Sequence, residues 1–209
     1  MQLVIATHNI HKVREFRAIL KMDKSLDLLS LSDFPHYHLP EETGTTFEEN
    51  AILKAVHAAN HLGQWVIADD SGLVVPALKG IPGVYSARFA GEQATDAENR
   101  HKLLNAMRGV PETERNAYYE CAIAVAGSDG LKKCVKATCE GNIAAEEKGN
   151  RGFGYDAIFI KYEYGKTFAE LEEDVKNRIS HRRKALDKIL IFLESIGQSS
   201  QVMSSMLDE

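Results

Sequence analysis

The chain lacks most features that would place it outside the ordinary globular proteins. It has only three cysteines in 209 residues, Cys121, Cys134 and Cys139. Their odd number and the absence of a CxxC pair argue against a disulfide framework, so we expect a reducing compartment. No apolar run approaches the roughly 20 residues that span a membrane, and the first residues lack the basic start of a signal peptide. We therefore expect a cytoplasmic protein without a membrane partner.

Excess positive charge and the common glycine-rich nucleotide motifs are also missing. The formal net charge is −5, so we expect no nucleic-acid partner, and any anionic ligand must be held by local clusters of cations. Neither the Walker A pattern nor a GxGxxG after a strand occurs, which argues against a P-loop and a dinucleotide fold. His57 and His61 are one helical turn apart but lack the glutamate of HExxH, so we discount them as a metal site.

Strands and helices are mixed along the chain. Apolar segments predict strands at residues 3–6, 26–31, 65–68, 115–126, 132–140 and 157–160. Capping residues and helical periodicity predict helices at about 10–21, 46–62, 95–107 and 180–196. This order predicts one α/β domain over residues 1–196. The polar, aperiodic residues 197–209 are expected to form a flexible tail.

Two adjacent carboxylates, Asp69 and Asp70, follow the predicted strand 65–68 and precede Ser71. Because side chains alternate along extended backbone, we expect the two carboxylates to point in opposite directions. Ligands of open α/β sheets bind beyond the carboxyl ends of strands, so a carboxylate here is a candidate magnesium ligand or general base. The alternative is an Asx turn that ends the strand for local reasons.

Cations crowd the predicted starts of the first and last helices, where the helix dipole disfavours them. They are His11, Lys12 and Arg14 at the first helix, and Lys176, Arg178, His181, Arg182, Arg183 and Lys184 at the last. A bound anion would resolve the conflict, because backbone N–H groups and cations could hold it together. The alternative is that these side chains point into water.

The segment Gly152-Phe153-Gly154-Tyr155-Asp156 combines two glycines with two aromatic rings. The glycines allow backbone geometries closed to other residues, and the rings could stack on a planar ligand. The alternative is a tight turn whose rings are buried in the core.

Six segments, in this order, resemble the inosine/xanthosine triphosphate pyrophosphatase family: residues 7–12, 41–51, 68–73, 82–89, 152–156 and 179–182. The resemblance covers residues 1 to about 196. It implies an elongated mixed β-sheet whose flanking helices form two lobes around a central cleft, usually in a homodimer. It also implies magnesium-dependent hydrolysis of inosine, deoxyinosine and xanthosine triphosphates to the monophosphate and pyrophosphate.

The resemblance assigns roles by position. Asp70 would be the proton acceptor and, with Glu41, would bind Mg²⁺. The residues that would contact the purine nucleoside triphosphate are Thr7, His8, Asn9, Ile10, His11, Lys12, Ser71, Phe153, Gly154, Tyr155, Asp156, Lys176, His181 and Arg182. Two alternatives remain. One is a pyrophosphatase for other modified or pyrimidine nucleotides, and the other is a nucleotide-binding regulator that would not need Glu41 and Asp70 to converge on a metal.

Overall fold

The computed structural model describes residues 1–21 and 25–207, with side chains described up to residue 197. The chain divides into two compact units. Unit 1 comprises Met1–Asp70, Ala122–Lys136 and Arg182–Glu209, and unit 2 comprises Ser71–Cys121 and Ala137–His181. In the described part of the chain, no helix is both long enough and apolar enough to cross a membrane.

Seven strands form one mixed sheet in the order β2-β1-β3-β4-β5-β6-β7. Their bounds are β1 Gln2–Ile5, β2 Asp27–Ser30, β3 Trp65–Val74, β4 Asn116–Gly127, β5 Gly130–Ile143, β6 Phe159–Lys161 and β7 Lys166–Thr167. β1 pairs in parallel with β2 and β3, whereas β6 pairs antiparallel with β5 and β7. The predicted fold class, a mixed α/β sheet with flanking helices, is confirmed.

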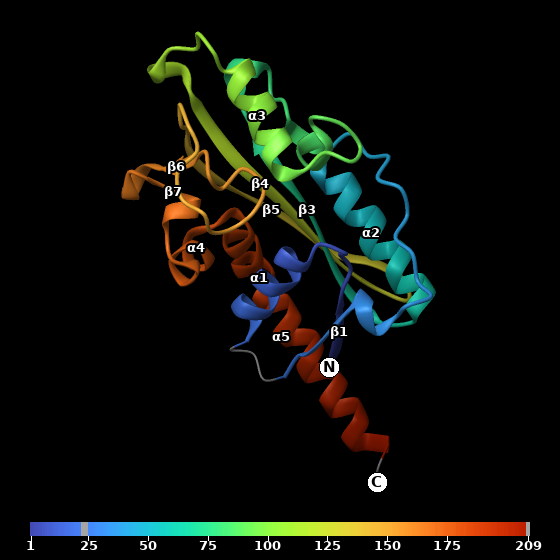
Figure 1. The fold of residues 1–209 in the computed structure, drawn as a ribbon. Helices are drawn as coiled ribbons and strands as arrows, with labels where there is room; N and C mark the ends of the chain where they lie inside the picture. Colours follow the sequence, from blue (N-terminus) through green and yellow to red (C-terminus); the bar gives the residue numbers. More distant parts are fainter. Residues whose placement is uncertain (22–24, 208–209) are drawn as a thin grey trace. The chain divides into compact units, whose positions relative to one another are not determined.

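Unit 1 contains three of the five α-helices that the structure describes. They are α1 (Ile10–Leu20), α2 (Phe47–Leu62) and, from Arg182 onward, α5 (His181–Leu207). Figure 1 shows α1 and α5 on one side of the strands of this unit and α2 on the other. The core between them includes β1 and the apolar face of α1, with Phe16 and Leu20 buried as the periodicity predicts.

Two helix boundaries in unit 1 follow local capping chemistry. Thr46 and Glu49 form the predicted capping box at the start of α2, and the left-handed Gly63 ends that helix. At the other end of the chain, α5 runs on to Leu207, beyond the predicted end near residue 196. The expectation of a flexible tail over residues 197–209 stays a prediction.

Unit 2 contains α3 (Asp96–Ala106) and α4 (Glu173–Ile179), which Figure 1 shows on opposite sides of its strands. Its core is an apolar cluster that includes Leu73, Leu103, Tyr119, Phe159 and Phe168. Short 3-10 helices complete the described elements: η1 Leu31–Asp33, η2 Pro76–Leu78, η3 Gly83–Arg88, η4 Glu112–Glu114, η5 Tyr162–Tyr164 and η6 Phe168–Glu170.

The structure corrects the prediction that one helix start carries all the cations from Lys176 to Lys184. Lys176 and Arg178 lie in the last turn of α4, where the helix dipole favours cations. Ser180 is extended and separates α4 from α5. For these two side chains there is therefore no electrostatic conflict that an anion would have to resolve.

Candidate active site

Asp69 and Asp70 lie inside β3, which continues to Val74. The predicted strand end at Ala68 is therefore wrong, as is the alternative of an Asx turn. The pairing of β3 with β1 ends two residues before Asp69: it runs from Leu3 opposite Trp65 to Ile5 opposite Ile67. The two carboxylates thus lie just past the carboxyl end of β1, where ligands of α/β sheets bind.

Asp69 belongs to a buried network of ion pairs in unit 1. Its Oδ2 accepts hydrogen bonds from Nη2 of Arg182 at 2.8 Å and from Nε at 3.2 Å, and Nζ of Lys12 lies 3.1 Å away. Arg182 also donates to the carboxylate of Glu15. Burial acts to raise the pKa of Asp69, but the charges of Arg182, Lys12 and Lys54 outweigh it and hold that pKa well below its usual range. Asp69 therefore stays ionised and anchors its neighbours.

Asp70 has a different set of partners, as expected for the opposite face of the strand. Its Oδ2 accepts a hydrogen bond from Nδ2 of Asn50 at 3.0 Å, and its Oδ1 lies 3.8 Å from Nζ of Lys54. Lys54 also donates to Glu42 at 2.6 Å. Burial raises the pKa of Asp70, against the opposing charges of Lys54 and Lys12. Of the two aspartates, Asp70 is therefore the one suited to accept a proton.

Asn50, in the segment 41–51, and Lys54, just after it, were assigned no role from the sequence, yet both are buried on α2 one turn apart. Oδ1 of Asn50 accepts a hydrogen bond from the backbone N of Gly44 at 2.8 Å, so Asn50 connects the loop before α2 to Asp70. The available signal was their position on the apolar face of the helix beside Ala51 and Ala55. A cation buried on such a face needs a charged partner.

Glu41, the predicted second magnesium ligand, is exposed in the loop before α2. Among the described residues, no group of three or more His, Cys, Asp or Glu side chains is arranged to hold a metal ion. Magnesium does not require such a group, because it binds one or two carboxylates and completes its shell with water and phosphate oxygens. The oxygen donors of Glu41 and Asp70 are of the kind that this ion prefers, so these residues fit it.

The segment from Thr7 to Lys12 includes the end of the connection from β1 and the first residues of α1. Asn9 is the N-cap of α1, as predicted, and its Oδ1 accepts hydrogen bonds from the backbone N of His11 at 2.9 Å and of Lys12 at 3.3 Å. Two N–H groups of the helix start are thus bound to Asn9. The side chains of His8, Ile10 and His11 are exposed, which leaves this segment accessible to a ligand.

In unit 2 the predicted binding residues gather around the buried carboxylate of Asp156. Its Oδ2 lies 2.5 Å from Nζ of Lys176 and accepts a hydrogen bond from the backbone N of Phe153 at 2.9 Å. Nζ of Lys176 lies 4.6 Å from the centroid of the Phe153 ring. Gly152 has φ +73°, and a Cβ there would collide with the Asp156 carboxylate, so this closed turn requires glycine.

The two rings of this turn have different environments. Tyr155 is buried and its hydroxyl donates to the carbonyl of Ser86 at 2.8 Å, whereas Phe153 is only half-buried. The backbone N of Gly154 donates to Asp96 at 2.7 Å, which fixes the turn to the start of α3. The interpretation as a tight turn with buried rings therefore holds for Tyr155, and stacking of Phe153 on a ligand stays a prediction.

The remaining predicted contacts differ in exposure. His181 is buried and stacks on Tyr119, with ring centroids 4.6 Å apart and an interplanar angle of 10°. Arg182 is 1% exposed and donates to Asp69 and Glu15. Ser71 is half-buried in β3.

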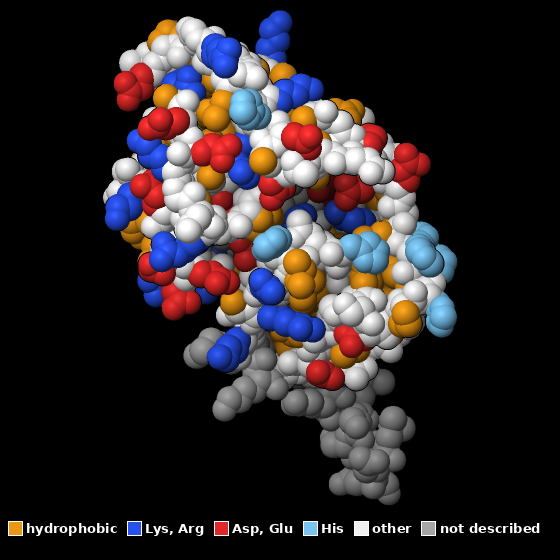
Figure 2. Space-filling view, in the orientation of Figure 1, with side chains coloured by type: hydrophobic (Ala, Val, Ile, Leu, Met, Phe, Trp, Pro, Cys, Tyr) orange, Lys and Arg blue, Asp and Glu red, His pale blue; other side chains and the backbone are white. Residues whose placement is uncertain are grey.

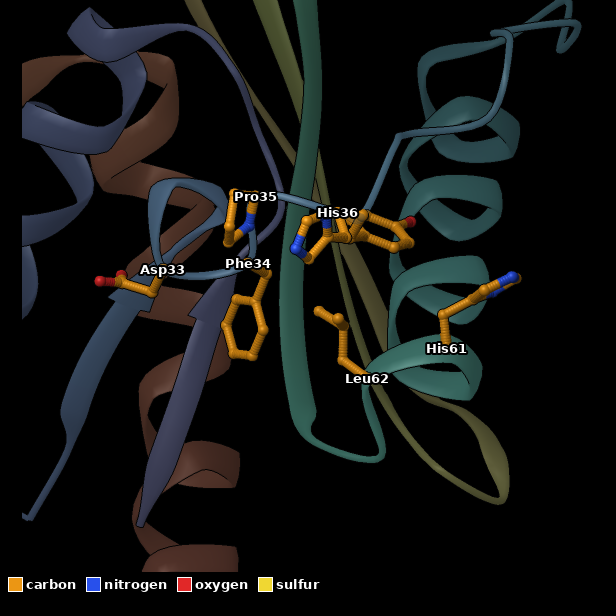
Figure 3. Close-up of a pocket in the computed structure, with 7 residues that line it drawn as sticks. Asp33, Phe34, Pro35, His36, His61 and Leu62 are labelled. Atoms are coloured by element: carbon orange, nitrogen blue, oxygen red, sulfur yellow. The ribbon is translucent and has the colours of Figure 1, made fainter.

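A pocket of about 400 Å³ lies elsewhere in unit 1. Its lining residues are Asp33, Phe34, Pro35, His36, Tyr37, His61 and Leu62. In Figure 3 the side chains of Asp33 and His61 point outward on opposite sides of it. None of the predicted site residues is among this described lining, so the pocket does not define the candidate active site.

Next to this pocket, His57 stacks on His61 with centroids 4.2 Å apart, and its Nδ1 is 2.8 Å from the hydroxyl of Tyr37. Figure 2 shows histidine side chains gathered on this face of the molecule. The aromatic contacts and the hydrogen bond to Tyr37 account for the His57–His61 pair as local packing on α2.

Unit 1 thus contains paired aspartates with lysine and amide partners, and unit 2 contains an aromatic turn closed on a buried Asp–Lys pair, within an α/β protein. A model of the Ham1 family matches residues 3–192. The chain belongs to the Ham1 family.

Relatives support this assignment over almost the whole chain. A protein of Protochlamydia amoebophila named dITP/XTP pyrophosphatase is 56% identical over 197 residues, which cover 94% of this chain and 99% of that protein. The solved Ham1 protein of Staphylococcus aureus is 44% identical with a TM-score of 0.82, and that of Coxiella burnetii is 40% identical with a TM-score of 0.84. Each match covers 93% of this chain and 99% of the solved one. The family resemblance seen in the sequence is confirmed.

Proposed function

We propose that this protein hydrolyses the triphosphates of inosine, deoxyinosine and xanthosine to the nucleoside monophosphate and pyrophosphate, and so removes them from the nucleotide pool. The observation that carries the proposal is the Asp69–Asp70 pair, in which one carboxylate is held ionised by cations and the other is buried with a raised pKa. The names of relatives that match nearly the whole chain support the same reaction.

Asp70 is the proton acceptor in this proposal. It takes a proton from the water that attacks the phosphoanhydride, while pyrophosphate leaves with the bridging oxygen. Asn50 and Lys54 hold the Asp70 carboxylate from α2. Lys12, anchored on Asp69, offsets part of the roughly four negative charges that a triphosphate carries.

Glu41 and Asp70 are proposed to hold Mg²⁺, which would neutralise phosphate charge and orient the substrate when bound. The oxygen donors of the two side chains and the family resemblance support this assignment. By the same resemblance we propose that the protein acts as a homodimer in the cytoplasm.

The residues of unit 2 are proposed to bind the base. Phe153 would stack on the purine, and donors from His181 or backbone N–H groups would recognise the oxygen at C6 that hypoxanthine and xanthine share. Adenine carries an amino group there, which would set donor against donor. Arg182 donates to Asp69 and Glu15, so we propose that it also acts by holding Asp69.

Release of pyrophosphate from a panel of triphosphates, with Mg²⁺ and then with excess chelator, tests this function. We expect inosine and xanthosine triphosphates to exceed ATP in kcat/KM by up to about 10⁴-fold, and chelator to abolish turnover. Preference for pyrimidine or other modified nucleotides would favour the first alternative. Nucleotide binding without pyrophosphate release would favour the regulator.

A further inference from the structure

Tyr119, on β4, connects two of the proposed base-binding residues of unit 2, and no motif points to it. Its side chain is 7% exposed and lies in the apolar core of that unit. The hydroxyl contacts Asp156, and the ring contacts His181. One side chain thus contacts both neighbours through different groups.

The hydroxyl of Tyr119 fixes the orientation of the Asp156 carboxylate. It donates to Oδ1 at 3.3 Å, while the backbone N of Phe153 and Nζ of Lys176 are within 2.9 and 2.5 Å of Oδ2. The two oxygens are therefore held by different donors, which restrains rotation of the carboxylate. Because Asp156 closes the Phe153 turn, this restraint extends to the stacking ring.

The ring of Tyr119 fixes the plane of the His181 imidazole. The two rings are nearly parallel, at an interplanar angle of 10° and a centroid distance of 4.6 Å. Tyr119 also makes an edge contact with Phe159, with ring centroids 4.7 Å apart, and its ring lies parallel to that of Phe168 at a centroid distance of 6.0 Å. These contacts hold the tyrosine ring rigidly, so it provides a fixed support for His181.

We propose that Tyr119 is a positioning residue for base recognition, which sets Asp156 and the Phe153 turn through its hydroxyl and His181 through its ring. The inference rests on the proposed function and adds a residue that does not itself touch the substrate. Its two contributions are separable, because phenylalanine keeps the ring and loses only the hydroxyl.

The test compares Tyr119→Phe and Tyr119→Leu with Tyr118→Phe as the matched control. Tyr118 is the preceding residue of β4, half-buried on the opposite face, and its replacement by phenylalanine removes the same hydroxyl. We expect Tyr119→Phe to raise KM for inosine triphosphate about 3- to 10-fold at unchanged kcat, as loss of one hydrogen bond predicts. Tyr119→Leu should raise KM further and reduce the preference over ATP, and Tyr118→Phe should change neither.

Two measurements do not depend on turnover. Calorimetric affinity for inosine monophosphate should fall by a similar factor in Tyr119→Phe but not in Tyr118→Phe. The NMR signals of the His181 ring, assigned with His181→Gln, should keep their ring-current shift in Tyr119→Phe and lose it in Tyr119→Leu. This second readout shows whether the stacked geometry exists in solution even if a variant is less stable.

The outcomes separate this inference from the proposed function. If the unmutated protein binds inosine monophosphate but releases no pyrophosphate, the function is wrong and the affinities still decide the role of Tyr119. If pyrophosphate is released and Tyr119→Phe matches the unmutated protein in KM and affinity, the positioning role is wrong and the function stands. A protein that binds no inosine nucleotide overturns both.

Discussion

Replacing each of the adjacent aspartates by asparagine should produce opposite phenotypes. Asp69→Asn removes a fully buried carboxylate from a network that also contains Lys12, Arg182 and Glu15. That change leaves two cations with a single carboxylate. Removing one partner of a buried ion pair costs about 3–5 kcal/mol of unfolding free energy. In a chain of this size it corresponds to a fall in Tm of roughly 6–20 °C.

Asp70→Asn should leave stability nearly unchanged and remove activity. Burial already disfavours the charge of Asp70, and Lys54 keeps its contact with Glu42 at 2.6 Å, so we expect a change within about 1 kcal/mol. Loss of the proton acceptor alone lowers turnover by about 10²- to 10⁴-fold, and loss of a metal ligand lowers it further.

Two measurements on both variants and the unmutated protein check these predictions: urea unfolding for stability, and initial rates of pyrophosphate release for activity. Each variant is the control for the other, because they differ by one position on one strand. Near-normal turnover in Asp70→Asn would refute the chemical assignment. An Asp69→Asn variant as stable as the unmutated protein would refute the role of the buried network.

Further predictions concern Lys12, Lys176 and the loss of folding stability at acid pH. Lys12→Ala should raise KM for inosine triphosphate about 10- to 100-fold through loss of a charge-assisted contact. Lys21→Ala, at the other end of α1, is the control and should leave KM unchanged. Equal KM values for the two variants would show that Lys12 has only a structural role. Lys176→Ala should raise KM, while the exposed Arg178→Ala serves as its control and should leave KM unchanged. Because the pKa of Asp69 is lowered in the folded state, its contribution is present above the ordinary value of 3.8 and is lost as pH falls below it. Urea midpoints below about pH 4 should therefore fall less steeply in Asp69→Asn than in the unmutated protein.

The parts of the fold that could be predicted are those governed by neighbours in the sequence. The capping boxes at Thr46 and Thr95 placed the starts of α2 and α3, because each box is closed within three residues. The alternation of side chains along an extended strand likewise predicted that Asp69 and Asp70 face opposite ways, because it depends only on adjacent residues. The start of the last helix near Ser180 was predicted, but the preceding short helix α4 (Glu173–Ile179) was missed, so Lys176 and Arg178 were assigned to the wrong helix end.

The contacts that could not be predicted join residues distant in the sequence. Arg182 meets Asp69 across 113 positions and Glu15 across 167, and Tyr119 meets Asp156 across 37. Local pattern shows only that a polar group lies on an apolar face, as with Lys54 on α2. It does not show which carboxylate meets that group.

The pairing of β3 with β1 also sets the face of the strand on which each aspartate lies. Leu3, Val4 and Ile5 lie opposite Trp65, Val66 and Ile67, and a slip of one residue would turn every later side chain of β3 to the other face. In such a register the Asp70 side chain would no longer lie on the face of Asn50 and Lys54. Only Gly63 and Gln64 separate the end of α2 from Trp65, so this short connection leaves little room for such a slip.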